Sequence, residues 1–236
     1  MATVVGIMDE PRWDANTDVI VVADPRTRRL LWVPRDLWCN ALGARVNSAF
    51  ARGGHGRLIG ALAELGVEVQ HAVCVRRDAS ERTLADVTVT VPVPRRIVLW
   101  YPLAPLRRIE DGRKQVIFEP PAESLSGERI HQWVGARHPE SDLDRIRRQQ
   151  VLLRSLLERS FNFATAVRGE GVSVSNPRAL EELQQIDASW HFETYSPLTP
   201  SVVDGAQVLL PRRPGPVARL RRAARKLAGE IGARTA

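Results

Sequence analysis

No run of 18 or more apolar residues occurs in this sequence of 236 residues, so it offers no segment long enough to span a bilayer as a helix. The first five residues lead straight into an apolar stretch, without the charged and hydrophobic regions of a signal peptide. On these two absences alone, the cytoplasm is one of the expected locations.

The sequence has few cysteines and histidines and lacks common catalytic and nucleotide-binding motifs. The two cysteines, Cys39 and Cys74, lack the spacing of metal ligands. We expect each to be a small buried side chain, with a disulfide only if the fold brings the two together. The five histidines form no ligand pattern, and no Gly-x-Ser-x-Gly or phosphate-loop motif is present. These absences exclude the serine hydrolase and nucleoside-triphosphatase classes.

Acidic residues are outnumbered only at the C-terminal end. The net charge is +7, and residues 211–236 hold eight basic residues against Glu230. The other 26 basic residues are balanced by 26 acidic ones, so the body of the chain is neutral. A neutral body that lacks zinc-ligand spacing and an RNA-binding aromatic motif argues against nucleic acid as a partner.

This charged end divides the chain into a predicted domain over residues 1–210 and a tail over residues 211–236. The tail opens with a linker rich in proline and arginine, then places apolar residues at helical spacing beside its arginines. A basic amphipathic helix of this kind can lie on an anionic membrane surface. A soluble terminus that only adds solubility is the equally weighted alternative.

Apolar stretches alternate with helical patterns along the predicted domain. We predict strands over residues 4–8, 19–23, 30–33, 72–75 and 87–93, and helices over residues 46–65, from 126 onward and over 177–185. Residues 190–195 fit either a strand or a loop. This order predicts an α/β fold, in which a mixed β-sheet is covered by helices on both faces in three α/β/α layers, followed by the basic tail helix.

A helix predicted to start at Ser141, from its capping-box pattern, carries polar groups that apolar packing does not explain. At about 100° per residue, Arg145 and Gln149 share a stripe with two leucines farther along. Such groups need partners when buried, and a guanidinium matches phosphate or carboxylate in a bidentate way. The alternative, at even odds, is a solvated helix end with ion pairs to Asp142 or Glu140.

Several separated segments resemble one known family. Residues 125–128, 133–137 and 142–150 are similar to the closing motif of the LytR-CpsA-Psr family, which ends in Asp-x-x-Arg-x-x-Arg-Gln-Gln. Residues 17–22, 24–27 and 31–36 are similar to the family's first half in order and spacing, and residues 46–54 resemble its Asn-x-Ala-Tyr and Gly-Gly segment. The likeness covers about residues 3–160.

The resemblance implies a phosphotransferase of the bacterial cell envelope, associated with the membrane. Such an enzyme moves a glycopolymer from a polyprenyl diphosphate carrier to a peptidoglycan sugar hydroxyl. By matching positions, the resemblance implies Mg²⁺ as cofactor, held by Asp9 and Asp18. It also implies a set of catalytic and diphosphate-binding residues, namely Arg35, Arg137, Arg145 and Gln149. Two further positions of the matched motifs join them as candidates, Asp36 as a catalytic residue of open role and Arg148 as a substrate-binding residue.

An isoprenoid carrier would need an apolar pocket that adjoins a charged mouth. Trp32, Trp38 and Trp133 lie close in sequence to the proposed anion ligands. Core packing is the commoner role of a tryptophan, so this placement alone does not identify such a pocket.

The sequence departs from the family pattern at Gly135, where the Arg-x-Arg pair has its first arginine, and residues 84–87 lack the Gly-Gly-Val turn. Three functions therefore stay in view. The first is an active phosphotransferase, the second a non-catalytic protein that binds polyprenyl phosphates, and the third an adaptor that acts at a membrane surface through its basic tail.

Overall fold

The structure is a computed structural model that describes residues 1–103, 112–136, 141–196, 198–203 and 205–211. Arg137 and the predicted tail helix lie outside these residues. In chain order, the elements are β1 (Thr3–Met8), β2 (Thr17–Asp24), β3 (Arg29–Trp32), β4 (Trp38–Cys39), β5 (Ala44–Arg45), the 3-10 helix η1 (Val46–Ser48), α1 (Gly54–Glu64), β6 (His71–Val75), α2 (Arg77–Leu84), β7 (Thr88–Pro92), β8 (Ile97–Pro102), β9 (Arg113–Phe118), β10 (Ala122–Ser126), α3 (Glu128–Gly135), α4 (Asp142–Glu158), α5 (Phe163–Ala166), β11 (Val172–Val174), α6 (Arg178–Leu183), β12 (His191–Thr194), β13 (Leu198–Val203) and β14 (Ala206–Pro211).

A six-stranded mixed sheet forms the centre, in the order β11-β6-β1-β2-β3-β12. Strand β1 is parallel to β6 and antiparallel to β2, and β3 is antiparallel to β2 and parallel to β12. Strands β1, β3, β6 and β12 therefore run in one direction, while β2 and β11 run in the other. The carboxyl ends of four strands meet the beginning of β2 at one edge of the sheet.

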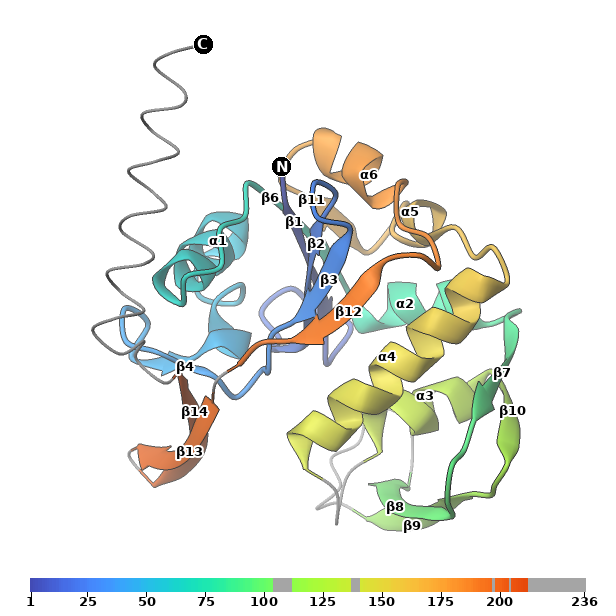
Figure 1. Ribbon diagram of the computed structural model, residues 1–236. Helices are drawn as coiled ribbons and strands as arrows, with labels where there is room; N and C mark the ends of the chain where they lie inside the picture. The colour runs from blue at the N-terminus through green and yellow to red at the C-terminus, as the bar shows by residue number, and fades with distance from the viewer. Residues whose placement is uncertain (104–111, 137–140, 197, 204, 212–236) are drawn as a thin grey trace.

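Helices cover both faces of this sheet, as the sequence predicts (Figure 1). Side chains alternate between the faces along each strand. On one face, Val4 and Val22 pack with Leu58 and Leu62 of α1 in a single buried cluster. On the other face, a second cluster joins strand residues to buried side chains of α2, α4, α5 and α6. The expected three-layer arrangement is confirmed.

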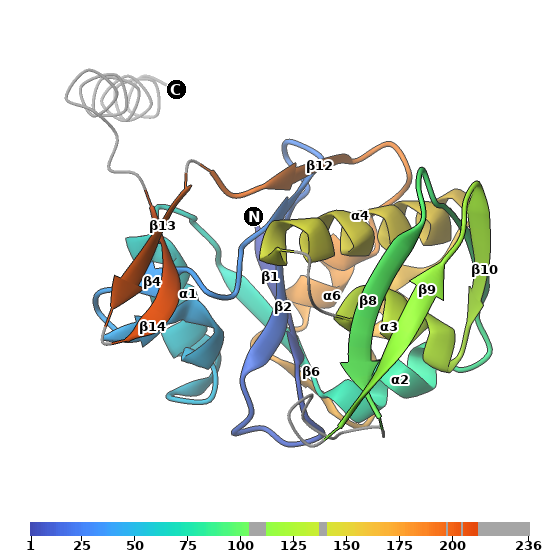
Figure 2. The ribbon, with the colours of Figure 1, turned by 90° about the horizontal axis from the view of Figure 1, so that it is seen from below.

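A smaller lobe lies beyond α4, as the view from below shows (Figure 2). It contains two antiparallel pairs, β7 with β10 and β8 with β9, which pack on α3 and α4. Trp133 of α3 meets Phe118 edge to face, with ring centroids 4.9 Å apart. Helix α4 therefore joins two cores, one shared with the central sheet and one shared with this lobe.

Most predicted elements are present, and the helical span 46–65 is interrupted at its glycines as expected. Gly54, with φ of 63°, begins α1 in a backbone conformation that favours glycine. Residues 191–194 form a strand. The sequence did not indicate α2, because that helix is polar along most of its length and buries only Ala79. Among the helices that the structure describes, none is long and apolar enough to cross a membrane.

Candidate functional site

Four charged residues meet at the sheet edge where strands β1, β3 and β6 end. Asp9 follows β1 directly, Asp18 lies at the start of β2, Arg35 follows β3, and Arg77 opens the helix after β6. Because the strand order is β6-β1-β2-β3, these positions follow one another across the edge in the order Arg77, Asp9, Asp18, Arg35. In open α/β sheets, ligands bind outside the carboxyl ends of strands.

Helix α4 brings a third arginine to the same edge. Ser141 and Asp144 form the predicted capping box, so the helix begins at Asp142 as expected. The side chain of Arg145 is only 4% exposed, and its Nη1 lies 3.2 Å from Oδ1 of Asp18, a residue 127 positions away. It also pairs with Asp142 in the first turn. The ion pair within the helix does form, but Arg145 is buried rather than solvated.

Several buried polar atoms at this point lack a hydrogen-bond partner among the residues that the structure describes. The donors are Nε of Arg35, Nε of Arg145 and Nε2 of Gln149, and one oxygen of Asp9 is in the same state. A buried donor without a partner costs free energy, so each such group calls for an explanation. Phosphate oxygens would accept hydrogen bonds from all three donors.

The arginines of the site are balanced by carboxylates. Arg35 pairs with Asp18, and its Nε lies 4.0 Å from Oδ1 of Asp142. Burial acts to lower the pKa of Arg35, but Asp18, Asp36 and Asp142 outweigh it and raise that pKa. Burial raises the pKa of Asp142 above its ordinary value, although Arg145 opposes this effect.

Asp9 and Asp18 fit a divalent cation that shares its shell with a substrate. Burial and the neighbouring charges of Asp18 and Glu10 raise the pKa of Asp9, and one oxygen of Asp9 has no hydrogen bond within the described ranges. No group of three or more His, Cys, Asp or Glu side chains that could hold a metal is found in the described part of the chain. Mg²⁺ binds through one or two carboxylates plus water and phosphate oxygens, so two aspartates are sufficient.

An apolar cavity of about 630 Å³ opens at this charged mouth. It runs between the sheet and the helices of the second face, and its wall includes both sheet residues and residues of α4. Val5, Val21 and Trp32 come from strands, and Leu153 and Leu156 come from α4. Asp9, Asp18, Arg35 and Gln149 line the same cavity at its polar end. An apolar pocket that adjoins a charged mouth, the arrangement that an isoprenoid carrier would need, is therefore present.

Two predicted site residues make their own contacts beside this group, and a third lies outside the described residues. Asp36 is close enough to Arg35 and Asp142 to affect the pKa of each. Asp36 forms an ion pair with Arg45, with 3.3 Å between Oδ1 and Nη1, and its carbonyl accepts from the amide of Leu209. The buried guanidinium of Arg148 donates to the carbonyl of Ala136, 2.8 Å away, and so ties α4 to the end of α3. Arg137 lies outside the described residues.

Several polar residues of the cavity wall escaped the sequence analysis, among them Arg77, Tyr101 and His131. Burial raises the pKa of Tyr101 and lowers the pKa of His131. Arg77 could have been found from its place immediately after a buried strand that runs parallel to the first one. Tyr101 and His131 gave no such indication, because they come from the smaller lobe, whose position over the sheet is set by tertiary packing.

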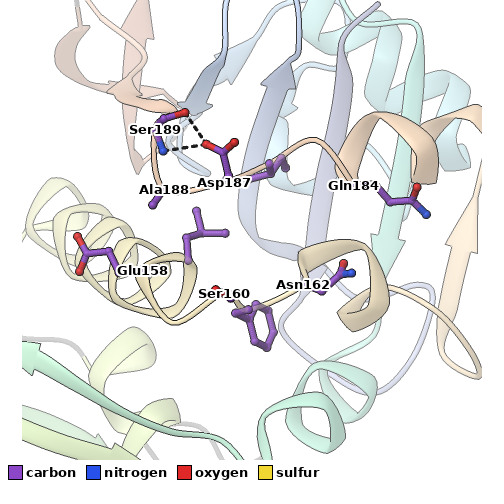
Figure 3. Close-up of a pocket in the computed structure, with 10 residues that line it drawn as sticks. Glu158, Ser160, Asn162, Gln184, Asp187, Ala188 and Ser189 are labelled. Carbon is purple, nitrogen blue, oxygen red and sulfur yellow. Dashed lines mark hydrogen bonds between the residues drawn. The ribbon is translucent and has the colours of Figure 1, made fainter.

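A separate hollow of about 570 Å³ lies at the far end of α4 (Figure 3). It is more open than the apolar cavity, and its wall includes Glu158, Gln184 and Asp187. The amide and hydroxyl of Ser189 donate to Asp187 there. None of the predicted site residues lines this hollow, so it is not the candidate site.

Solved structures share this fold at low sequence identity. TagV of B. subtilis matches with a TM-score of 0.64 and 15% identity, over 89% of this chain and 90% of that chain. TagT of B. subtilis, bound to LI-WTA, matches with a TM-score of 0.64 and 19% identity, over 98% of this chain and 90% of that chain. Protein gbs0355 of Streptococcus agalactiae matches with a TM-score of 0.64 and 18% identity, over 89% and 82%.

A search of curated proteins gives no match. The family model described as "LytR_cpsA_psr family" matches residues 3–175, which is well over half of the sequence. That span contains the sheet edge, the charged mouth and most of the wall of the apolar cavity. The chain therefore belongs to the LytR-CpsA-Psr family, whose members act in the cell envelope as glycopolymer transferases.

Proposed function

We propose that this protein transfers a cell-wall glycopolymer from a polyprenyl diphosphate carrier to a sugar hydroxyl of peptidoglycan. The observation that carries the proposal is the apolar cavity of about 630 Å³ that has Asp9, Asp18 and Arg35 at its polar end, where the buried Arg145 pairs with Asp18. A lipid diphosphate has the same two-part chemistry, an apolar chain joined to an anionic head. TagT, which shares the fold, has been solved bound to LI-WTA, a wall teichoic acid ligand.

The isoprenoid chain would occupy the apolar part of the cavity. Burying apolar surface contributes about 25 cal/mol for each Å² removed from water, so the chain supplies binding energy without taking part in the reaction. The wall residues Val21, Trp32 and Leu153 are the kind of surface that such a chain requires. The diphosphate then lies at the polar end, beside Arg35 and Gln149.

The arginines act mainly by positioning and by neutralising charge. Arg35, Arg145 and Gln149 each have a buried donor for which a phosphate oxygen is a suitable acceptor. The acceptor hydroxyl attacks the phosphorus bonded to the glycan, and a new P–O bond forms as the bond to the bridging oxygen breaks. Polyprenyl monophosphate leaves with the bridging oxygen and its electron pair, while the hydroxyl proton passes to a base.

Asp9 and Asp18 would hold the Mg²⁺ that the family resemblance implies. When bound, the ion would neutralise negative charge on the phosphate oxygens and favour departure of the leaving phosphate. The raised pKa of Asp9, caused by burial and by the charge of Asp18, supports this assignment because a cation would relieve both effects.

The test is turnover of a polyprenyl diphosphate-linked sugar by the purified chain, followed as release of polyprenyl phosphate with and without Mg²⁺. Arg145→Ala should lower turnover by at least about a hundredfold, since removing one preorganised charge-stabilising donor commonly costs that much. Arg147→Ala is the matched control, because Arg147 lies on the same helix but is 72% exposed and pairs only with Asp144 among the described side chains. The control should retain turnover and thermal stability.

Equal turnover in Arg145→Ala and in the unaltered chain would contradict the proposal. Binding of the lipid diphosphate without turnover would favour the second function, a non-catalytic carrier-binding protein, for which Gly135 is the motivating feature. Removal of residues 214–236 tests the proposed contact of the tail with anionic membranes, through binding to liposomes. An unchanged liposome affinity after that removal would argue against a membrane role for the tail.

A further inference from the structure

We infer that Arg77 forms a second phosphate-binding position in the mouth of the cavity, on the side of Asp9 opposite Arg35 and Arg145. The inference rests on the proposed function and adds to it a ligand for the second phosphate of the diphosphate. Its starting point is the order of residues across the sheet edge, in which Arg77 and Arg35 lie on opposite sides of the two aspartates.

The charges on the Arg35 side are already balanced within the protein. Arg35 and Arg145 both pair with Asp18, and both lie near Asp142. Two guanidinium groups therefore face two carboxylates, which leaves little net positive charge for an incoming diphosphate. A second phosphate therefore calls for a further hydrogen-bond donor elsewhere in the mouth.

Arg77 has the position and the hydrogen-bonding capacity to provide that donor, although its charge is also paired, with Glu81. Its side chain is about a quarter exposed and lines the cavity. Nε donates to Glu81 at 2.8 Å, whereas Nη1 reaches the carbonyl oxygen of Asp9 at 3.4 Å. The second contact is longer than a strong N–H···O hydrogen bond, so a phosphate oxygen can replace it at little cost. The pair with Glu81 fixes the guanidinium while this exchange occurs.

Gly135 provides a reason for an arginine at position 77. Gly135 lines the same cavity, and a Cβ built there would lie 3.7 Å from the ring of Tyr101, in ordinary contact. Tyr101 is also close enough to Arg77 for each group to affect the pKa of the other. A side chain at position 135 and the side chain of Arg77 would therefore border the same tyrosine. The cation that is absent from position 135 is supplied to this part of the wall by Arg77.

The experiment compares the binding of farnesyl diphosphate and farnesyl monophosphate to the full chain in the presence of Mg²⁺, by calorimetry. Arg77→Ala should raise the Kd for the diphosphate by about tenfold or more, the usual effect of losing one charge-assisted hydrogen bond. The Kd for the monophosphate should change by less than about twofold, which is the variation expected when a substitution does not touch the ligand. Arg77→Gln, which keeps the long side chain, should show the same selectivity if the alanine variant is unstable.

Arg82→Ala is the matched control, since Arg82 lies on the same helix, pairs with Asp78 and does not line the cavity. It should leave both Kd values unchanged. Adding Gly135→Arg to Arg77→Ala should restore diphosphate affinity, which a purely structural role of Arg77 does not predict.

Equal weakening of both ligands, or no effect on the diphosphate, would overturn the role of Arg77 while leaving the proposed function intact. Failure of the unaltered chain to bind either ligand would instead overturn the proposed function, and the role of Arg77 with it. The two failures are therefore distinguishable by the behaviour of the unaltered chain.

Discussion

The two faces of the central sheet differ in how completely helices fill the space above them. On the face covered by α1, strand residues and helix residues pack into a single buried cluster. On the face covered by α2, α4, α5 and α6, similar apolar side chains surround a cavity of about 630 Å³. Apolar composition alone therefore does not distinguish a core that is packed for stability from one that is left open for a ligand.

Neighbouring residues of β2 show this difference most directly. Val21 and Val22 are both valines, and both are buried, at 8% and 4% exposure. Val21 lines the cavity, whereas Val22 belongs to the packed cluster with α1. Because side chains alternate along a strand, one step in sequence separates a position with a binding role from one with a packing role.

The largest difference in stability between the two faces of the central sheet is expected when one leucine that covers each face is replaced by alanine. Leu62→Ala in α1 should lower the free energy of unfolding by about 2–5 kcal/mol, because Leu62 is fully buried in the packed cluster. Leu153→Ala in α4 should cost less, about 1–2 kcal/mol, because Leu153 is partly buried and already borders empty space. Urea unfolding of both variants measures the two values. Equal losses would mean that the cavity does not persist in solution.

Replacing each of the two neighbouring valines with phenylalanine should give a smaller contrast in stability. Val22→Phe should have the larger effect on stability, and Val21→Phe the larger effect on lipid binding. Val22→Phe should lower the free energy of unfolding by about 1–3 kcal/mol, because it overpacks a filled core. Val21→Phe should cost less than about 1 kcal/mol, because the ring enters existing space. It should nevertheless weaken binding of farnesyl diphosphate, which Val22→Phe should affect less. Unaltered lipid affinity in Val21→Phe would argue against the cavity as the isoprenoid site.

The smallest expected effect concerns acid sensitivity on the packed side. Burial acts to raise the pKa of Glu64, but hydrogen bonds from Cys39, Ala41 and Asn40 outweigh it and lower that pKa below the ordinary value of 4.5. A lowered pKa means that Glu64 stabilises the fold above pH 4.5 and loses this contribution as the pH falls through the lowered value. Because the group is exposed, Glu64→Gln should cost less than about 1 kcal/mol near neutral pH.

The pKa values of two carboxylates at the cavity mouth shift in the opposite direction to that of Glu64. Burial raises the pKa of Asp9 and of Asp142, so their contribution to stability is fully present below the ordinary pKa of 3.8 and is lost as the pH rises through the raised value. Thermal unfolding of the unaltered chain and of Glu64→Gln between pH 3 and pH 7 separates the contribution of Glu64 from those of Asp9 and Asp142, because the substitution removes only the contribution of Glu64. The difference between the two curves should shrink as the pH falls. A constant difference would contradict the assignment.

Local rules account for most of the fold and for part of the site. Apolar stretches indicated β1, β2, β3 and β6 of the central sheet, left β12 as a strand or a loop and did not indicate β11. The Ser141–Asp144 pattern indicated the start of α4. The stripe that joins Arg145 and Gln149 to buried leucines indicated two polar groups facing inward, and both are buried. Helix α2 went unrecognised because its packing depends on its position beside β1 and α5, which a polar sequence does not encode locally.

The roles of some site residues did not follow from sequence order. Asp36 pairs with Arg45, which itself lines the cavity, whereas the guanidinium of Arg148 donates to the end of α3. Matching a motif gives the neighbourhood of a side chain, whereas its direction depends on the backbone turn and on the surrounding contacts. Arg77 illustrates the converse, since no motif indicated it and the order of strands places it beside Asp9.

The sequence by itself determined four strands of the central sheet, several helices, the start of α4 and the family, because these depend on residue spacing over a few turns or on matching motifs. The tertiary structure decided that Asp18 and Arg145, 127 residues apart, share an ion pair. It also decided that one sheet face is packed and the other hollow. The physical reason is that a cavity arises from the distance between whole elements, and that distance is fixed by the summed packing of every element around it.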